Sequence, residues 1–415
     1  MAIVRPFKGL RPKNQEIAEN MISLPYDVMN RKEAKEMAGN NEYSFLKIVR
    51  SEINLPDSVD PYAKEVYEKA KEVLTDWSAK GILVEDEKPV FYIYRQIMEG
   101  RVQTGLVGCT SIDDYINDII KKHEFTRKEK ELDRINHFDI TDANTEPVFL
   151  TYKKNDRVNE IVSAWVDSHQ AEYDVVTEDG IEHIVWVLKD EALVKELVEL
   201  FSKIDYLYIA DGHHRSASAV AAGKKRREEN TSYTGEEEFN RFLAVIFPDE
   251  DLYVMDYNRV IKDLNGNTSE EFINKISDKF DVAEASDSQY KPAKKHDYGM
   301  FLDGKWYVLT AKEGTYPNED PVLSLDSAIL QNNLLAPILG IEDPRTDKRI
   351  DFIGGIRGLA ELEKRVNDDM KVAFALYPVT IEDLMGVADA GQVMPPKSTW
   401  FEPKLRSGLF VHKLS

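Results

Sequence analysis

The chain has 415 residues, 42 % of them hydrophobic, and its 54 basic and 75 acidic residues give a net charge of -21. This negative excess disfavours nucleic acid as a partner, because binding a duplex requires clustered Lys and Arg to neutralise phosphates. No apolar stretch approaches the roughly 20 residues that span a bilayer, no secretory signal is readable, and the single Cys109 has no partner for an internal disulfide, so we expect a cytoplasmic protein without a membrane partner.

Both helices and strands are expected along the chain. Residues 61–80 carry apolar side chains at helical spacing ahead of Gly81, which predicts a helix with a glycine C-cap. Three β-hairpins are predicted where an acidic residue and a glycine separate two β-rich runs. Their paired runs are 89–98 with 101–112, 173–177 with 181–188, and 298–302 with 306–310.

The rest of the chain completes a mixed α/β pattern. Residues 206–210 predict a short buried strand, and further helices are expected at 216–229, 269–280 and 324–339. The proline-rich tail 394–410 cannot be a helix. The predicted fold class is therefore mixed α/β (α+β), one region of 1–415 that we divide into parts 1–120, 121–250 and 251–415.

The segment IADGHHR at 209–215 is the strongest candidate for chemistry. A buried strand ends, Asp211 and Gly212 turn the chain, and a helix begins at once, so free N–H groups and the positive end of the helix dipole converge. Such a point favours an anion. Arg215 can offer a bidentate fork to phosphate, and His213 and His214 add two further donors. The alternative is that Asp211 merely caps the helix while the histidines pack locally.

A metal pair is a third interpretation of these histidines. Adjacent helical residues point about 100° apart, so His213 and His214 are poorly placed to chelate one ion, and no other His or Cys lies at ligand spacing. A transition-metal centre is therefore disfavoured.

The second cluster is KKHEFTRKEKELDRINHFD at 121–139. On a helix, one face would carry a continuous cationic or titratable stripe. Its members are His123, Arg127, Lys130, Arg134 and His137. An ordinary solvated helix is the alternative. Glu124, if partly buried, would suit a general base, because desolvation raises the pKa of a carboxyl group.

Three weaker signals remain. Asn144, Thr145 and Glu146 precede a strand, where a site or a plain turn is equally expected, and Asp27 in SLPYDV poses the same choice. The tail offers Lys397 and Lys404, together with Ser398, Thr399 and Arg406, as a rigid cationic strap or as surface decoration. No P-loop motif occurs, and GGIRG at 354–358 lacks the Rossmann spacing.

Several of these segments resemble one family. RPFKGLRP, SLPYDV, the HEFTR of residues 123–127, IADGHHR and MPPKSTWFEPKLRSGL, in this order, are similar to the uncharacterised bacterial family called domain of unknown function 1015. The resemblance implies an association with serine and phosphoserine biosynthesis genes.

The DGHHR segment also resembles a motif of archaeal free-serine kinases of the ParB and sulfiredoxin-like superfamily. There the motif contacts nucleotide phosphate, and an upstream His-Glu pair supplies the catalytic base. His123 and Glu124 are similar to that pair, although 87 positions separate Glu124 from Asp211 (211 - 124). The implied fold is a ParB/sulfiredoxin-like nucleotide-binding core with additional mixed subdomains.

Together these observations predict a nucleotide-dependent kinase for a small hydroxyl metabolite, with free L-serine as the expected substrate and ATP or ADP with Mg²⁺ as cofactors. Gly212, His213, His214 and Arg215 are assigned to phosphate, Asp211 to Mg²⁺ or substrate, and Glu124 to the base. His123, Arg127, Asn144, Glu146, Lys397 and Lys404 are possible contacts for an anion or the substrate. The alternative function is a non-catalytic, ParB-like nucleotide-binding regulatory switch.

Overall fold

The computed structural model describes residues 1–286 and 289–415. Its contacts group the chain into two compact units, Met1–Leu252 with Pro403–Ser415, and Tyr253–Glu402. The division predicted at residues 120 and 250 stays a prediction. Among the described residues, none of the helices combines the length and the apolar character that a membrane span requires.

The first unit is built on a nine-stranded mixed sheet with the order β6-β11-β8-β12-β5-β4-β10-β9, to which β1 adds by pairing with β5. Its strands are β1 (Val4–Arg5), β4 (Phe91–Met98), β5 (Arg101–Ser111), β6 (Ile120–Lys121), β8 (Val148–Tyr152), β9 (Tyr173–Val176), β10 (Glu182–Leu188), β11 (Leu207–Asp211) and β12 (Arg241–Pro248). Two short pairs join distant segments, β2 (Leu10–Pro12) with β3 (Leu83–Glu85), and β7 (Ala143–Asn144) with β21 (His412–Lys413).

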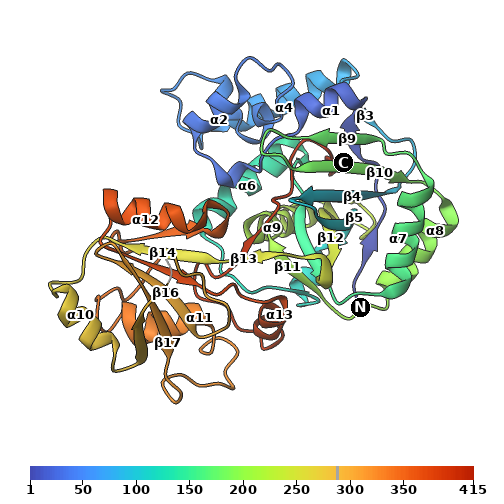
Figure 1. Cartoon of the computed structure of the whole chain (residues 1–415). Helices are drawn as coiled ribbons and strands as arrows, with labels where there is room; N and C mark the ends of the chain where they lie inside the picture. Colours follow the sequence, from blue (N-terminus) through green and yellow to red (C-terminus); the bar gives the residue numbers. More distant parts are fainter. Residues whose placement is uncertain (287–288) are drawn as a thin grey trace. The chain divides into compact units, whose positions relative to one another are not determined.

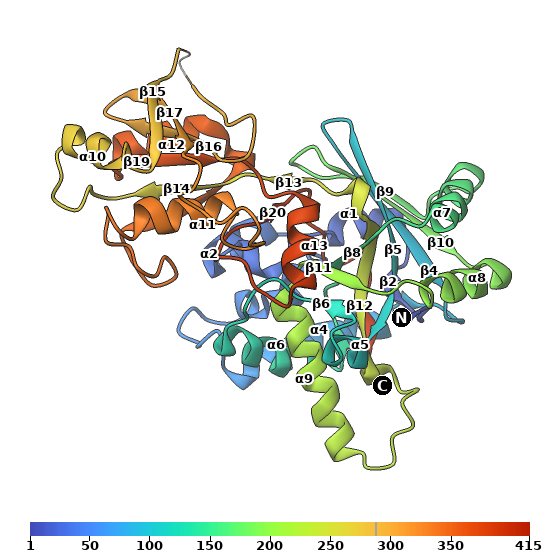
Figure 2. The same ribbon diagram turned by 90° about the horizontal axis from the view of Figure 1, so that it is seen from below.

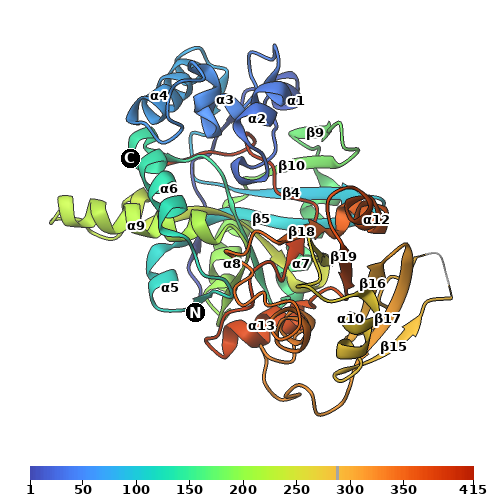
Figure 3. The same ribbon diagram turned by 90° about the vertical axis from the view of Figure 1, so that its left-hand side faces the viewer.

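Helices surround this sheet. They are α1 (Gln15–Met21), α2 (Arg31–Ala38), α3 (Leu46–Val49), α4 (Lys64–Ala79), α5 (Ile112–Ile116), α6 (Lys128–Thr141), α7 (Asp156–Ser168), α8 (Glu191–Phe201) and α9 (His213–Glu229), with short 3₁₀ turns η1 (Tyr26–Val28), η2 (Ser51–Asn54), η3 (Glu238–Asn240) and η4 (Asp249–Asp251). In Figure 1, α7 and α8 lie side by side beside the sheet. Trp165 on α7 and Phe201 on α8 belong to the same hydrophobic core as Phe91 and Ile93 on β4. Figure 3 shows α6 running next to α9.

The second unit contains a six-stranded antiparallel sheet with the order β15-β17-β16-β19-β14-β18. Its elements are β13 (Val254–Met255), β14 (Tyr257–Ile261), α10 (Ser269–Ile276), β15 (Phe280–Glu284), β16 (Asp297–Leu302), β17 (Lys305–Ala311), α11 (Asp326–Leu330), the π-helical turn η5 (Gln331–Leu335), β18 (Ile350–Gly354), η6 (Gly355–Arg357), α12 (Gly358–Asp368), β19 (Val372–Leu376), α13 (Ile381–Asp389) and β20 (Trp400–Phe401). A core with Phe272, Tyr298 and Leu330 lies between this sheet and its helices.

The mixed α/β prediction is confirmed, and so are all three hairpins. At the first hairpin turn, Glu99 and Gly100 both have positive φ, at 52° and 79°, as the two-residue turn requires. Two helix predictions need correction. The helix predicted at 269–280 ends at Ile276, because Phe280 begins the edge strand β15, and the helix predicted at 324–339 continues from α11 as a π-helical turn.

Candidate functional site

Three segments meet at one end of the first unit's sheet. Strand β6 pairs parallel with β11, so the loop after β6 and the turn after β11 leave the sheet at the same end. Strand β8 runs antiparallel to β11, so the residues that precede β8 lie at that end too. Figure 2 shows β6, β11 and the start of α9 close together. The sheet topology thus brings 122–127, 144–147 and 211–215 into one neighbourhood.

The turn between β11 and α9 presents uncommitted backbone donors. A bulge shifts the β11–β8 register between Ile209 and Asp211, and Gly212 has φ 93°. This positive φ favours glycine, and a Cβ at Gly212 would also make a tight contact, 3.1 Å from Arg215 Nε. The Asp211 Oδ1 atom accepts the Gly212 N–H at 2.9 Å, but no side chain caps α9. The N–H groups of residues 213–215 have no acceptor among the described residues.

The two histidines of the turn diverge and hold opposite ends of one loop. Edge-to-face packing joins the His213 ring to that of His123, with centroids 4.5 Å apart, and the His123 N–H approaches His213 Nε2 at 3.5 Å. On the other side, His214 Nε2 accepts the Arg127 N–H at 3.0 Å. The loop from His123 to Arg127, which we call the HEFTR loop, is therefore attached to the turn at both ends.

The predicted cationic stripe on a helix from 121 to 139 is wrong. Helix α6 begins only at Lys128, so His123 and Arg127 precede it. Their backbone N–H groups bond to the histidines of the turn instead of continuing a helix. Of the three stripe residues that lie within α6, Arg134 and His137 are buried and Lys130 is exposed.

The sheet nevertheless brings Glu124 to the turn across 87 positions of sequence. Its Oε2 atom lies 3.8 Å from His213 Nδ1, and its side chain is 42 % exposed. The parallel pairing of β6 with β11 produces this proximity, while the hairpin of β9 and β10 falls between the two segments in sequence. Glu124 is thus accessible to solvent and adjacent to the turn.

Two cations neutralise Asp211. Lys404 Nζ lies 3.3 Å from Asp211 Oδ2, and Arg215 Nη2 lies 3.6 Å from the same atom. Burial disfavours ionisation of Asp211, but Lys404 and then Arg215 outweigh it, so the pKa of Asp211 falls below its usual range. Lys404 is fixed in turn, because Gln96 Nε2 donates to its carbonyl at 2.9 Å.

The histidines of the site are neutral near pH 7. Burial lowers the pKa of His123 to about 4 and that of His213 well below its ordinary value. Burial also lowers the pKa of His214, against the opposing charge of Asp27. They can therefore orient a ligand by hydrogen bonds, while Lys404 and Arg215 supply the positive charge.

A second group of polar side chains, which we call the buried cluster, lies behind the turn. Its members are Tyr26, Arg134, Glu146, Arg215 and Ser407. Glu146 Oε1 accepts the Tyr26 N–H and the Ser407 hydroxyl, both at 2.9 Å. The Arg134 guanidinium lies over the Tyr26 ring at 4.0 Å, with its Nη1 3.6 Å from Glu146 Oε2. Arg215 Nη1 donates to the Pro147 carbonyl at 2.6 Å.

The Arg215 fork therefore points into protein. Burial lowers the pKa of Arg215, but Asp27 foremost, then Asp211 and Glu146, raise it above its usual range, so the guanidinium stays charged. The sequence pattern assigned Arg215 to phosphate and placed Arg134 on a cationic stripe facing the phosphates, whereas Arg134 is buried against Tyr26 and Glu146. The position of Ser407 follows from the tertiary fold, and no local signal marked it.

Asp27 contributes an open carboxylate beside the buried cluster. It follows Tyr26 in η1, and both backbone polar groups of Tyr26 are bonded, the N–H to Glu146 and the carbonyl to Arg50 Nη1 at 3.2 Å. The Asp27 side chain is exposed, and no hydrogen bond or ion pair joins it to another described residue. A fixed backbone thus presents a solvated carboxylate near Arg215 and His214.

Two predicted residues make their contacts elsewhere. Asn144 Oδ1 lies 3.3 Å from the Leu243 N–H and 3.2 Å from His412 Nδ1, so it fastens the β7–β21 pair. Lys397 belongs to the second unit, where its carbonyl accepts from Arg259 Nη2 at 3.1 Å.

The tail is not surface decoration within the first unit, because residues 405–412 are buried. Arg406 pairs with Asp179 and lies 3.2 Å from His183 Nε2, so it ties the tail to the β9–β10 hairpin. The tail thereby delivers Lys404 to Asp211 from a fixed position.

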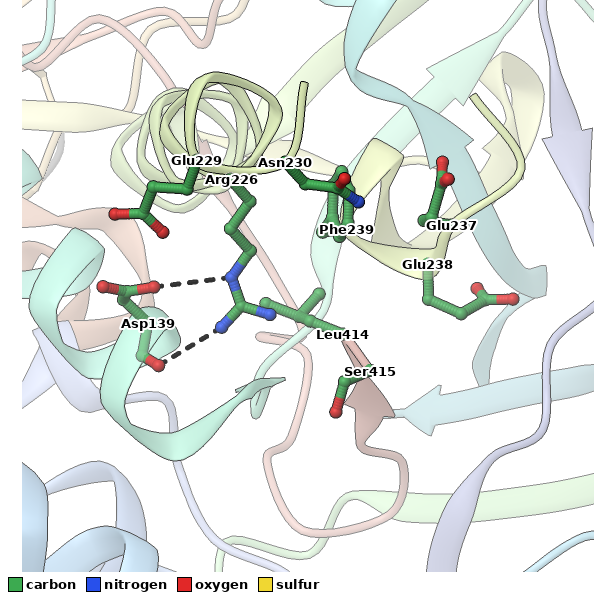
Figure 4. Close-up of a pocket in the computed structure, with 9 residues that line it drawn as sticks. All are labelled: Asp139, Arg226, Glu229, Asn230, Glu237, Glu238, Phe239, Leu414 and Ser415. Carbon is green, nitrogen blue, oxygen red and sulfur yellow. Dashed lines mark hydrogen bonds and ion pairs between the residues drawn. The ribbon is translucent and has the colours of Figure 1, made fainter. Parts of the chain in front are cut away.

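A cavity of about 590 Å³ lies at the other end of α9 (Figure 4). Four of the nine lining residues are acidic, and Arg226 there is bonded to Asp139. It contains none of the predicted site residues, so it is separate from the turn.

The fit of Mg²⁺ depends on which carboxylates are open. Within residues 1–286 and 289–415, no three His, Cys, Asp or Glu side chains are grouped to hold a metal ion by themselves. Mg²⁺ in nucleotide sites usually takes one or two carboxylates, with phosphates and waters completing the shell. Asp211 already receives Gly212, Lys404 and Arg215, so it fits poorly. Asp27, which is exposed, fits better.

A family model described as "Protein of unknown function (DUF1015)" matches residues 4–328. Among curated proteins, no relative matches this sequence. Similar solved structures include a mutant free serine kinase in complex with AMP (15 % identity, TM-score 0.36, covering 75 % of this chain and 95 % of that one). A conserved hypothetical protein from Pyrococcus furiosus has 15 % identity and a TM-score of 0.36 over 73 % of this chain and 94 % of that one. C-terminally truncated SbnI from Staphylococcus aureus has 9 % identity and a TM-score of 0.38 over 74 % and 87 %. The activity of this chain has therefore to be inferred from its own residues.

Proposed function

Because the chain belongs to the DUF1015 family of proteins of unknown function, we propose its function from its own site: a nucleotide-dependent phosphotransferase that acts on the hydroxyl group of a small metabolite. ATP or ADP is the donor, and free L-serine is the first acceptor to test.

The uncapped start of α9 is the observation that carries this proposal. Three adjacent N–H groups, at residues 213–215, lack acceptors among the described residues, and the positive end of a 17-residue helix lies at the same point. A phosphate group would satisfy these donors. Lys404 and Arg215 add positive charge, and the exposed carboxylates of Asp27 and Glu124 provide groups for a proton and a cation.

We assign the nucleotide phosphates to the N–H groups of His213, His214 and Arg215, with the Lys404 ammonium group as the neighbouring cation. Lys404 now pairs with Asp211, and an incoming phosphate would share its ammonium group. Arg215 acts from behind as a positioning residue, since it bonds to Pro147 and lies under Gly212. Gly212 allows the turn to approach the ligand closely.

The proposed reaction moves one phosphoryl group from the nucleotide to the acceptor oxygen. A P–O bond forms at that oxygen, the bond to the leaving phosphate breaks, and the hydroxyl proton passes to a carboxylate. Glu124 is our candidate for this base, because it lies beside His213 and remains accessible. Asp27 is the next candidate.

Mg²⁺ would neutralise charge on the phosphates that transfer and leave. Asp211 was the ligand suggested by the sequence, but its oxygens already have protein partners. We therefore propose Asp27 as the protein carboxylate that would hold the ion with the phosphates.

Support for L-serine is of a different kind. It rests on the resemblance of IADGHHR and of the His123-Glu124 pair to free-serine kinases. The side chains of the site would also suit other small hydroxyl compounds, so the acceptor must be tested within a panel.

The test is a phosphoryl-transfer assay with purified protein, Mg²⁺, and ATP or ADP, against a panel of hydroxyl acceptors including L-serine, L-threonine and glycerate. We expect a phosphorylated product with at least one acceptor and L-serine to give the highest kcat/KM. Nucleotide binding without any transfer would favour the regulatory switch, and absence of nucleotide binding would reject both functions.

A further inference from the structure

The HEFTR loop exposes a large apolar side chain at its apex. Phe125 is 69 % exposed, although its loop begins at the buried His123 and returns to the turn at Arg127. Thr126 bonds through its hydroxyl to Glu131, which fixes the descending side of the loop. The loop is therefore held on both sides, and the phenyl ring is presented to solvent by an anchored backbone.

The anchoring also limits how far Phe125 lies from the phosphate donors. It is two residues from His123 and two from Arg127, and two residues of extended chain span about 7 Å. Both of those residues contact a histidine of the turn through their N–H groups. A ligand whose phosphates occupied the turn would therefore have its next chemical groups within reach of this ring.

From this arrangement we propose that Phe125 binds the nucleobase by stacking. The inference rests on the proposed function, because it takes the phosphates to lie at residues 213–215. A nucleotide carries phosphates and a flat aromatic base on one molecule, which matches a donor turn with an exposed phenyl ring beside it. Every base offers a π-face to an aromatic side chain, so stacking tolerates differences between bases.

Stacking predicts which part of the ligand Phe125 recognises. Replacing a stacking aromatic by Ala typically costs about 5- to 100-fold in affinity. Phe125→Ala should weaken binding of ATP by that factor and should affect GTP similarly. Inorganic tripolyphosphate, which has the phosphates but no base, should bind wild type and Phe125→Ala within about twofold.

Calorimetric titration of the full chain with ATP and with tripolyphosphate, both with Mg²⁺, tests the proposal; ADP and pyrophosphate form a second matched pair. Phe125→Tyr should keep wild-type affinity, because it keeps the ring. Leu132→Ala is the matched control, since Leu132 is also apolar and 58 % exposed but lies on α6. It should leave both affinities unchanged.

Two results would overturn the stacking role while leaving the proposed function in place. One is unchanged ATP affinity in Phe125→Ala. The other is an equal loss for ATP and tripolyphosphate, which would mean that Phe125 orders the loop instead of contacting the base. Failure of the wild type to bind either ligand would overturn the proposed function, and the stacking role with it.

Discussion

The two sides of the β11–α9 turn differ in how their polar groups are satisfied. One side, which we call the open side, holds the N–H groups of residues 213–215, which lack acceptors among the described residues, and the exposed carboxylates of Asp27 and Glu124. In the buried cluster, Glu146 and Ser407 bond to each other and Arg215 bonds to a backbone carbonyl. Both regions contain acidic and basic side chains, so residue type alone does not distinguish residues that act on a ligand from residues that stabilise the fold.

The difference assigns separate roles to the two sides. A buried charge that has its partners inside the protein serves mainly to fix geometry, and removing one partner leaves the other buried charges uncompensated. A charge at the surface beside unsatisfied donors can change partners when a ligand arrives. We therefore expect substitutions on the open side to change turnover or binding with little effect on stability, and substitutions in the buried cluster to do the reverse.

The largest expected effect is on turnover, at Glu124. Glu124→Gln keeps the shape of the side chain but loses its basicity, so kcat should fall by roughly a hundred to ten-thousandfold. Nucleotide affinity and unfolding midpoint should barely change. The measurement is steady-state product formation alongside direct nucleotide binding, with Glu129→Gln on the exposed start of α6 as the control. Near-normal turnover would transfer the role of base to Asp27.

Within the buried cluster, Glu146→Ala should act on stability. Burial raises the pKa of Glu146 while Arg215 and Arg134 lower it, and removal of the carboxylate leaves both guanidinium groups without this partner. The expected loss is about 3–5 kcal/mol in the free energy of unfolding, measured by urea denaturation against Glu129→Ala. A variant with unchanged stability but no nucleotide binding would place Glu146 on the open side and break the distinction.

The smallest effect is a pH dependence from His123. Its pKa is about 4 in the fold and about 6.5 in an unfolded chain, so only the unfolded state gains a proton between these values. The buried, neutral His123 therefore contributes its full share to the free energy of unfolding above pH 6.5, and this share is lost as the pH falls towards 4. Phenylalanine does not titrate, so the unfolding free energy of His123→Phe should fall less steeply as the pH is lowered. The difference from the wild type should be up to about 1.4 kcal/mol per pH unit.

The check is the unfolding free energy of wild type and His123→Phe at several values between pH 7 and 5. His169→Phe serves as the control, because His169 is exposed. Parallel pH profiles for wild type and His123→Phe would show that the His123 ring is accessible to protons in the folded protein.

Local patterns were sufficient for the parts of the fold that depend on neighbours in sequence. The turn at Glu99-Gly100 requires positive φ, and the apolar spacing of residues 64–79 fits one buried helix face, so both elements were predictable. The same local reasoning failed for residues 121–127, because the N–H groups of His123 and Arg127 find their partners 90 and 87 positions away.

The site was predictable in the same uneven way. The turn at 211–215 was identified from its strand, glycine and helix, and the structure confirms those elements. The sequence could not show that the Arg215 side chain points away from the predicted phosphate position, since only the fold reveals that its guanidinium donates to the Pro147 carbonyl. The hydrogen bond from Ser407 to Glu146 spans 261 positions, and no local pattern in the sequence points to it.

The central claim, that nucleotide phosphates bind at the N–H groups of the turn, can be tested most directly by NMR. Selective ¹⁵N-histidine labelling leaves only 8 backbone signals in this chain of 415 residues, and substitution of His213 and His214 in turn would assign the two signals of interest. On titration with ATP and Mg²⁺, the amide signals of His213 and His214 should shift downfield and saturate together, whereas those of His169 and His296 stay in place. Unchanged signals from His213 and His214 at saturating nucleotide would contradict the claim.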